Sequence, residues 1–302
     1  MFRRFIFILL VAAVTACSTS DPQKQERPTP GTMSVFKLGS YSSDSGSDAV
    51  GVIPEAKLHD VTVSIEYPIK AGSCPLIVFE RPASASHRSY ESIVSYWTSY
   101  GYVCIRTPDV KLVLDSLDEL ERRYPELKGK IDRTRIGVGG HIANATTLVP
   151  ADPRVRAALV MSPERIEDVR KPAMIMAGSD LKTNEPLPGR REAFAKLSAG
   201  DKYFVTIQGA RESSFGGGFN EAQIEREARL PQPYVNPNDP YQQRGITPEG
   251  RSTTFERERR IIADIRIVSL AFWDAWLRDN AAAREFLASA HMNEGLVRTE
   301  KK

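Results

Sequence analysis

Continuous apolar runs and periodic apolar positions alternate along most of the chain. A short continuous apolar run predicts a strand buried on both faces, whereas apolar residues three and four positions apart predict a helix that covers a sheet. The predicted strands are 61–67, 75–79, 102–106, 135–141, 155–161, 173–177 and 203–207. The predicted helices are 90–100, 114–123, 191–197, a long helix with apolar positions from Ile261 to Trp276, and a short last helix capped by Asn280.

The order of these elements predicts the fold class. Residues 61–67 alternate in the manner of an antiparallel strand, and strand and helix then follow one another, which favours an α/β fold with a parallel sheet and right-handed crossovers. Residues 59–290 have the length of one such domain. Residues 213–250 are rich in Gly, Pro, Asn and Gln and predict a long loop, either a binding surface or a disordered segment. Thr253 and Glu256 have the spacing of a capping box at the start of the long helix.

The first residues resemble a secretory signal. Two arginines, a short apolar run and small residues precede Cys17, and the run is too short to cross a bilayer as a helix. Residues 14–17 (Val-Thr-Ala-Cys) resemble a bacterial lipobox, which implies that residues 1–16 are removed and that Cys17 is acylated, for example with palmitate. The alternative is an ordinary signal peptide. Ser18 follows where an inner-membrane retention signal usually has Asp, so the resemblance favours the outer membrane.

The composition after Cys17 predicts a flexible tether over residues 17–58, because Ser, Pro, Gly, Asp and Thr bury little surface. Residues 291–302 are expected to form a C-terminal tail. The formal net charge is +3 and falls to +1 (3 minus 2) when the two arginines of the signal are removed. This balance gives no argument for a nucleic-acid partner.

The cysteines and histidines carry little predicted chemistry. Cys74 and Cys104 lie near the starts of successive predicted strands. Two alternatives remain for them: a disulfide bond, which an extracytoplasmic compartment permits, or two buried free thiols. The four histidines and the cysteines do not have metal-ligand spacing. We therefore expect no metal and no cofactor.

Residues 135–144 (Arg-Ile-Gly-Val-Gly-Gly-His-Ile-Ala-Asn) look like a strand that leads into a sharp turn. In α/β-hydrolases this turn has the pattern G-x-S-x-G and presents the nucleophilic serine. Here Ile142 has the serine position and Asn144 the second glycine position. Because that turn usually needs a positive φ, which β-branched residues resist, we expect a relaxed turn in which Ile142 fills the former pocket.

Several further segments, in this order, resemble the dienelactone-hydrolase, chlorophyllase-like and platelet-activating-factor-acetylhydrolase-like branch of the α/β-hydrolases. The resemblance covers residues 57–290 and implies an α/β-hydrolase fold, with a mostly parallel central sheet and helices on both faces. Besides the stretch above, the segments are 99–103 (SYGYV), 152–155 (DPRV), 178–180 (GSD), 215–217 (FGG) and 269–275 (SLAFWDA). A fold of this kind does not by itself imply an activity.

The resemblance also implies where a catalytic triad would lie. Hydrolysis needs a nucleophile, an imidazole base, a carboxylate that orients the imidazole, and two N–H donors for the oxyanion. Asp180 has the acid position, whereas Glu212 has the position of the histidine and Ile142 that of the serine. In the oxyanion loop a His-Gly pair is replaced by Arg81 and Pro82, and proline has no N–H, although the N–H of Ala83 remains and could still point inward. The resemblance therefore implies a degenerate triad and no expected catalytic residue.

Other serines could in principle have replaced the missing nucleophile. Ser162 ends a predicted strand, Ser213 and Ser214 adjoin Glu212, and His141 adjoins the turn. We interpret them as turn, loop and hydrogen-bonding residues, because a new nucleophile, base and oxyanion site would have to arise together. The charged clusters 190–192 and 256–260 are interpreted as solvated helix faces.

The resulting hypothesis is an outer-membrane lipoprotein with an α/β-hydrolase-like domain that is a pseudoenzyme, and that binds a small-molecule or protein ligand of the envelope. The first alternative is a carboxylic ester hydrolase, an esterase or lipase, with a relocated nucleophile. The second is a structural envelope lipoprotein without a ligand.

Overall fold

A computed structural model of the chain describes residues 37–38, 40–83, 85, 89–141, 152–163, 166–179, 185–186, 189–216, 248–289, 291–292 and 296–302. All of them belong to one compact unit, Ser34–Lys302. The predicted signal segment 1–16 and most of the predicted loop 213–250 lie outside the described residues.

The described strands and helices follow one another along the chain as the apolar pattern predicts, with additions at both ends. The strands are β1 (Lys37–Leu38), β2 (Tyr41–Ser42), β3 (Val50–Leu58), β4 (Val61–Pro68), β5 (Cys74–Glu80), β6 (Val103–Thr107), β7 (Ile131–His141), β8 (Val155–Met161), β9 (Ala173–Ser179), β10 (Lys202–Gln208), β11 (His291–Met292) and β12 (Val297–Lys301). The helices are α1 (Glu91–Ser99), α2 (Val110–Asp115), α3 (Leu117–Arg123), η1 (Pro125–Leu127), α5 (Arg190–Ala195), α6 (Glu212–Phe215), α9 (Pro248–Leu277) and α10 (Ala281–Ala288).

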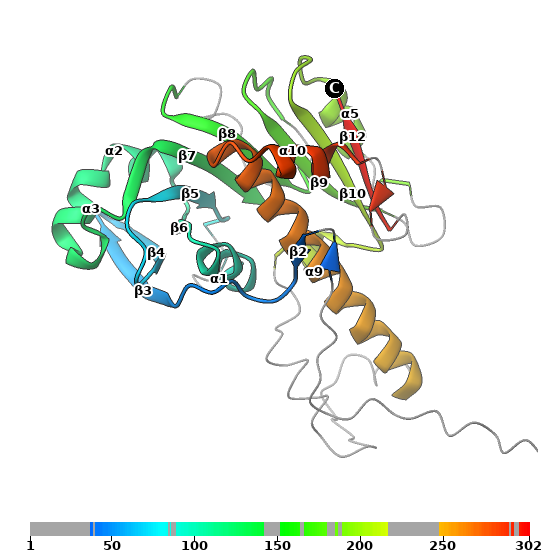
Figure 1. Cartoon of the computed structure of the whole chain (residues 1–302), viewed down its shortest axis with the longest axis horizontal. Helices are drawn as coiled ribbons and strands as arrows, with labels where there is room; N and C mark the ends of the chain where they lie inside the picture. The colour runs from blue at the N-terminus through cyan, green and yellow to red at the C-terminus, as the bar shows by residue number, and fades with distance from the viewer. Residues whose placement is uncertain are drawn as a thin grey trace, which may run out of the picture. The chain divides into compact units, whose positions relative to one another are not determined.

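One ten-stranded sheet organises the fold, in the order β11-β12-β10-β9-β8-β7-β5-β6-β4-β3 (Figure 1). The strands from β10 to β6 in this order are parallel to their neighbours, while the outer strands at both edges pair antiparallel. The parallel strands are buried on both faces, which explains their continuous apolar runs. The predicted α/β class is therefore confirmed, with a mixed, largely parallel sheet.

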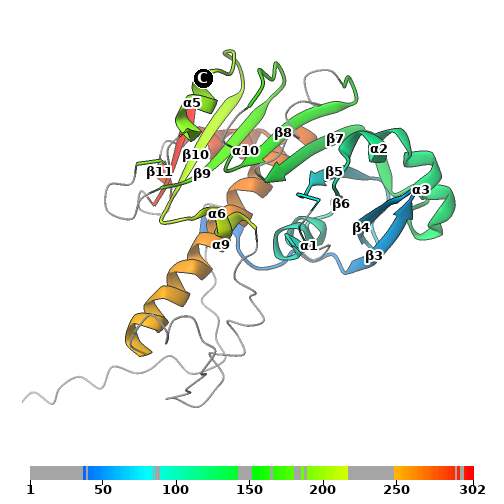
Figure 2. The same ribbon diagram turned by 180° about the vertical axis from the view of Figure 1, so that it is seen from behind.

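Each face of the sheet has its own apolar core. On one face α1, α9 and α10 cover the strands, and on the other α2, α3 and α5 do so. Figures 1 and 2 show the long helix α9 crossing the first of these faces. A Cβ at Gly137 of β7 would lie 2.6 Å from the ring of Trp273, so the glycine allows α9 to approach the sheet closely. The rings of Trp97 and Trp273 meet edge to face, with centroids 5.8 Å apart, and join α1 to α9.

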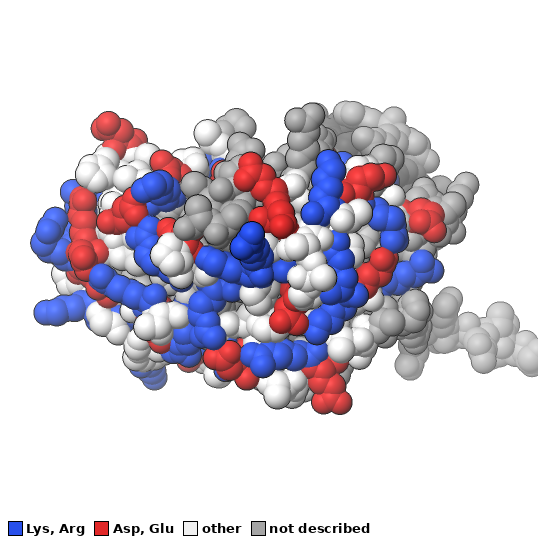
Figure 3. Space-filling view, turned by 90° about the horizontal axis from the view of Figure 1, so that it is seen from above, with Lys and Arg blue, Asp and Glu red and all other residues white. Residues whose placement is uncertain are grey.

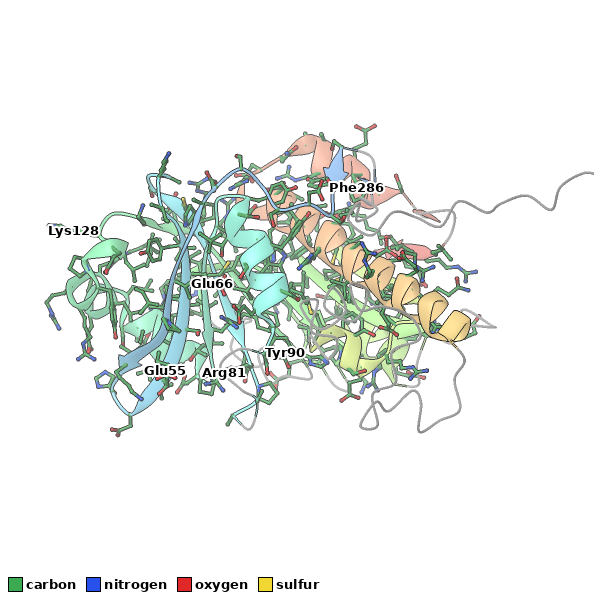
Figure 4. All side chains as sticks on the ribbon, turned by 90° about the horizontal axis from the view of Figure 1, so that it is seen from below. Glu55, Glu66, Arg81, Tyr90, Lys128 and Phe286 are labelled. Carbon is green, nitrogen blue, oxygen red and sulfur yellow. The ribbon has the colours of Figure 1, made fainter. Side chains whose placement is uncertain are left out.

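A buried ion pair lies between α1 and the sheet. Arg106 Nη2 of β6 donates to Glu66 Oε1 of β4 at 2.8 Å, and the two side chains are only 2% and 1% exposed. Ser95 Oγ of α1 donates to the second carboxylate oxygen at 2.5 Å, and Arg106 Nη1 donates to the carbonyl of Ser89 at 3.0 Å. Figure 4 shows Glu66 beside α1. The bonds of the pair to Ser95 and to the Ser89 carbonyl fix the start of α1 to the sheet. Removal of either charged partner would leave the other charge buried and uncompensated.

The prediction of a tether that extends to residue 58 is wrong at its C-terminal end. β3 pairs with β4 from Val50 to Leu58, and Ala56 and Leu58 are fully buried. Pro54 and Glu55 hide this pattern, and a bulge between Ile53 and Ala56 interrupts the alternation. The domain therefore includes an edge strand that composition alone assigns to the tether.

Residues 40–48, the N-terminal arm, also contact the folded unit. Tyr41 Oη donates to Asp274 Oδ2 of α9 at 3.1 Å, and Tyr96 Oη of α1 donates to the carbonyl of Ser42 at 2.7 Å. The Tyr41 ring lies 5.2 Å from that of Phe286 in α10, and β2 lies beside α9 in Figures 1 and 4. The arm is thus held by helices that are more than 50 residues away in the sequence.

The predicted C-terminal tail is corrected as well. β12 pairs antiparallel with β10 in register Phe204↔Glu300, and β11 pairs with β12. Val297 and Thr299 are buried and Arg298 between them is exposed, which is the pattern of an edge strand. The pairing partner of β12 is far away in the sequence, and its polar composition does not indicate a strand.

Two helix predictions change in detail. The predicted helix 114–123 is two helices, α2 and α3, separated at Ser116. The long helix begins at Pro248, so the expected capping box at Thr253 and Glu256 lies inside α9. The cap of the last helix is confirmed, because Asn280 Oδ1 accepts from the backbone N–H of Ala283 at 3.1 Å.

Cys74 and Cys104 are free, buried thiols. Cys104 is in register with Ile77, three residues beyond Cys74, so the two cysteines are offset along the strands and belong to cores on opposite faces. This geometry excludes the disulfide that the compartment would permit. Among the described helices, none combines the length and the apolarity that a membrane span requires.

Candidate functional site

The parallel strands end at one edge of the sheet, where ligands of open α/β sheets usually bind. The residues that end β5, β7 and β9 are Glu80, His141 and Ser179, and Ser162 directly follows β8. Burial, and to a smaller extent nearby Asp109, raises the pKa of Glu80 to about 7. This edge therefore gathers ionisable and hydroxyl side chains from separate crossovers.

Of the three positions that the sequence resemblance aligns with a catalytic triad, the structure describes one. Ile142 and Asp180 lie outside the described residues, and with them the hypothesis of a relaxed turn. Glu212 is the first residue of α6, and its side chain is 54% exposed. Its Oε2 lies 3.9 Å from Nη2 of Arg190, so the carboxylate faces a guanidinium.

The loop after β5, which the sequence resemblance aligns with an oxyanion loop, is closed by its own arginine. The backbone N–H of Arg81 donates to the carbonyl of Thr107 at 2.9 Å, so it is not aimed at a ligand. The guanidinium of Arg81 bonds the carbonyls of Ala85 at 2.9 Å and Thr62 at 3.2 Å. Pro82 supplies no N–H. The Arg81 backbone thus bonds β6 and its guanidinium bonds β4, so neither Arg81 nor Pro82 offers a backbone N–H to an oxyanion. Figure 4 shows Arg81 at the same edge of the molecule as Tyr90.

His141 is the histidine that the fold places at the strand ends. Its side chain is almost fully buried, and its Nδ1 lies 2.8 Å from the hydroxyl of Tyr90. Either Tyr90 donates to Nδ1 and Nε2 carries the proton, or Nδ1–H donates and Nε2 is an acceptor. Within the described part of the chain, Nε2 is buried and has no hydrogen-bond partner. The ring lies 6.1 Å from that of Phe215, in the single turn of α6.

The surroundings keep this imidazole neutral. Burial, assisted by the positive charge of Arg190, lowers the pKa of His141 to about 4. Burial, together with the carboxylate of Glu212, raises the pKa of Tyr90 to about 12. Tyr90 itself has a φ of 69°, which a tyrosine rarely adopts, and it directly precedes α1.

Arg190 connects the remaining groups. This arginine begins α5, is 9% exposed, and donates from Nη2 to Ser162 Oγ at 3.4 Å. Ser162 is fully buried and has a φ of 51° at the end of β8. Pro163 follows it, so the residue after this serine has no N–H to offer to an oxyanion.

The other two candidate serines do not join this group. Ser213 is exposed, whereas the buried Ser214 donates from Oγ to Glu258 Oε2 of α9 at 3.3 Å and accepts from the backbone N–H of Arg211. Ser214 therefore fixes α6 to α9, which lie side by side in Figure 2. Burial raises the pKa of Glu258.

The interpretation of the charged clusters as solvated faces is wrong at two positions. Arg190 and Glu258 are 9% and 5% exposed, although their neighbours Arg191 and Glu256 are solvated. A helix of alternating charges gives no sign of which single residue turns inward. From the sequence, Tyr90 is predicted only as a core residue. Its contact with His141 joins residues 51 positions apart, and a local sequence pattern does not predict a contact over that separation.

These side chains at the strand ends offer groups that can bind a ligand, but their pairing is poorly suited to the chemistry of a catalytic triad. It offers a fixed cation, a neutral imidazole with one nitrogen unpaired in the described part of the fold, and hydroxyls that bond the cation or the imidazole. Among the described residues, no group of three or more His, Cys, Asp or Glu side chains could hold a metal ion. A scan against protein-family models and a search of curated proteins find no significant match.

Proposed function

We propose that this chain is a lipid-anchored envelope protein whose α/β-hydrolase-like domain binds a ligand at the carboxyl edge of the sheet without hydrolysing it. The observation that carries the proposal is the pairing of the polar groups there. His141 pairs with Tyr90, and Arg190 contacts both Ser162 and Glu212. A hydrolase needs instead a serine that is bonded to an imidazole and an imidazole that is bonded to a carboxylate.

The hydrolase-like fold is part of this proposal. It is supported by the largely parallel sheet with helices on both faces, and by the end of β7 at His141, directly before the position where the nucleophile would lie. The low pKa of His141 also favours binding over catalysis, because a general base works best when its pKa is near the working pH.

The anchor and the location rest on the sequence. Acylation of Cys17 would hold the domain at a membrane, and the residue after it favours outer-membrane sorting. A small-molecule or protein ligand is favoured over nucleic acid by the small net charge. Figure 3 supports this, because basic and acidic side chains are interspersed over the face in view.

The direct test uses the full chain purified in detergent. We expect it neither to hydrolyse p-nitrophenyl butyrate above the buffer rate nor to react with a fluorophosphonate probe of activated serines. A double variant, Ile142→Ser with Glu212→His, restores the two residue types that the aligned triad positions lack and should gain labelling. Hydrolysis by the unmodified chain would overturn the proposal, and a folded double variant without labelling would overturn the alignment of residues 135–144.

The second candidate, an ester hydrolase with a relocated nucleophile, is favoured by one observation. Ser162 has a positive φ at a strand end, as the serine of a hydrolase turn does, and lies beside Arg190. Fluorophosphonate labelling that disappears in Ser162→Ala would establish this candidate. Pro163 and the full burial of Ser162 argue against it. A purely structural lipoprotein remains the third candidate and differs by predicting that no ligand binds.

A further inference from the structure

Two hydrogen-bonding groups at the strand ends have the chemistry of an anion site. His141 Nε2 is buried and without a partner in the described part of the fold. Leaving such a group unpaired is unfavourable, so an occupant that bonds it gains correspondingly. Arg190 adds a nearly buried guanidinium, which recognises planar anions through paired N–H donors.

The Tyr90 hydroxyl allows the imidazole to act as a donor. When Tyr90 donates to Nδ1, the proton of the neutral ring lies on Nε2, which can then donate to an anionic oxygen. The positive charge of Arg190 favours the binding of an anion, and disfavours a cation, near this guanidinium. The side chains beside the imidazole are aromatic, with Tyr90 and Phe215 rings 5.6 and 6.1 Å from the His141 ring.

Glu212 is the third component and is itself an anion. Its carboxylate lies at 3.9 Å from Arg190, near the outer limit of an ion pair, and 54% of the side chain is exposed. An exposed carboxylate at this distance contributes little to stability and can turn into solvent at small cost. An external carboxylate bonded to the same Arg190 Nη2 would compete with Glu212 for this guanidinium.

We propose that His141 and Arg190 form a binding site for an organic carboxylate with an apolar tail, and that Glu212 is an internal competitor for it. This inference rests on the proposed non-hydrolytic binding function and names its ligand class. The carboxylate accepts from Arg190 and from His141 Nε2–H, and the tail lies against the aromatic rings. No covalent bond is made or broken.

The probe is hexanoate, and binding to the full chain in detergent is followed by the imidazole nitrogen resonances in NMR, with the His141 signals identified from a His141→Phe variant. Hexanoate should shift the His141 Nε2 signal to that of a hydrogen-bonded Nε2–H. 1-Hexanol, which has the tail without the charge, should bind at least about tenfold more weakly, since it cannot form the charge-assisted hydrogen bonds.

Variants along α5 and α6 separate the proposed roles. Arg190→Gln should weaken hexanoate binding about tenfold or more, and Glu212→Gln should strengthen it about threefold. Arg191→Gln is the matched control, because this neighbour is exposed and pairs with Glu300, so affinity should not change. Glu212→Gln changes an exposed side chain and keeps the test decisive if the Arg190 variant does not fold.

Three results would overturn the assignment: no shift of the His141 signals with hexanoate, equal affinity of the Arg190→Gln and Arg191→Gln variants for it, or equally tight binding of inorganic phosphate. The proposed function fails separately, through hydrolysis of p-nitrophenyl butyrate by the same preparation. A preparation that neither hydrolyses the ester nor binds hexanoate therefore contradicts the carboxylate site alone.

Discussion

The neutral burial of His141 makes stability depend on pH in a direction that can be calculated. Its pKa is lowered from an ordinary value of 6.5 to about 4, by burial and secondly by Arg190. The unfolded chain has the ordinary value, so as the pH falls from 6.5 to 4 the unfolded state takes up a proton that the folded state does not. The stability from this residue is complete above pH 6.5 and decreases as the pH falls towards 4.

The magnitude follows from the difference of about 2.5 between the two pKa values. At about 1.36 kcal/mol for each pKa unit, the full loss is about 3 kcal/mol, and about 2 kcal/mol of it falls between about pH 7.5 and about pH 5. This is a large share of the stability of an ordinary domain, about 5–15 kcal/mol.

The assay compares urea unfolding of the full chain and of His141→Asn at both pH values, followed by tryptophan fluorescence. The variant should lose about 2 kcal/mol less than the unmodified chain between about pH 7.5 and about pH 5. His59→Asn is the matched control, because the side chain of His59 is 61% exposed, and it should behave like the unmodified chain. Glu80, whose raised pKa acts in the opposite direction, is present in all three proteins and cancels in the comparison. Equal pH dependence in the chain and in His141→Asn would refute the reasoning.

Three further predictions concern other parts of the molecule. Arg106→Leu should lower the free energy of unfolding by about 3–5 kcal/mol in chemical denaturation, because Glu66 would keep a buried charge without its partner; a loss below about 1 kcal/mol would contradict this. Gly178→Ala should prevent normal folding, judged by circular dichroism and thermal unfolding, because the new Cβ would overlap the carbonyl oxygen of Ala210; an unchanged melting temperature would show that the backbone adapts. Cys17→Ala should abolish palmitate labelling and release the protein from the membrane fraction, and retained labelling would exclude this residue as the anchor.

The sequence predicts the centre of the sheet well and its edges poorly, for a physical reason. Buried parallel strands such as β5 and β8 are continuous apolar runs, which few other structures produce. The edge strands β3 and β12 bury only alternate residues, and their remaining positions carry Pro, Glu, Arg and Lys, as exposed edges commonly do. Composition therefore assigns them to a tether and a tail.

The candidate site is predictable only in part. The positions of Glu212, Arg81 and Pro82 follow from the family resemblance, but what these residues contact does not. Arg190 looks like any residue of a charged helix, and it turns inward because α5 begins at the strand ends beside Ser162. Such a contact depends on where two crossovers meet in space, which no local pattern records.

The N-terminal arm would have a mechanical consequence under the proposed acylation of Cys17. A force on Cys17 would reach the domain through residues 40–48, where Tyr41 bonds Asp274 and Gly46 N–H bonds Ser99 Oγ at 2.8 Å. These contacts precede β3 in the chain. Tension from the N-terminal side would therefore act on the contacts with α9 and α1 before it acts on the pairing of the edge strand β3 with the sheet. The arm would then take up the force before it reaches β3, the edge strand that follows it in the chain.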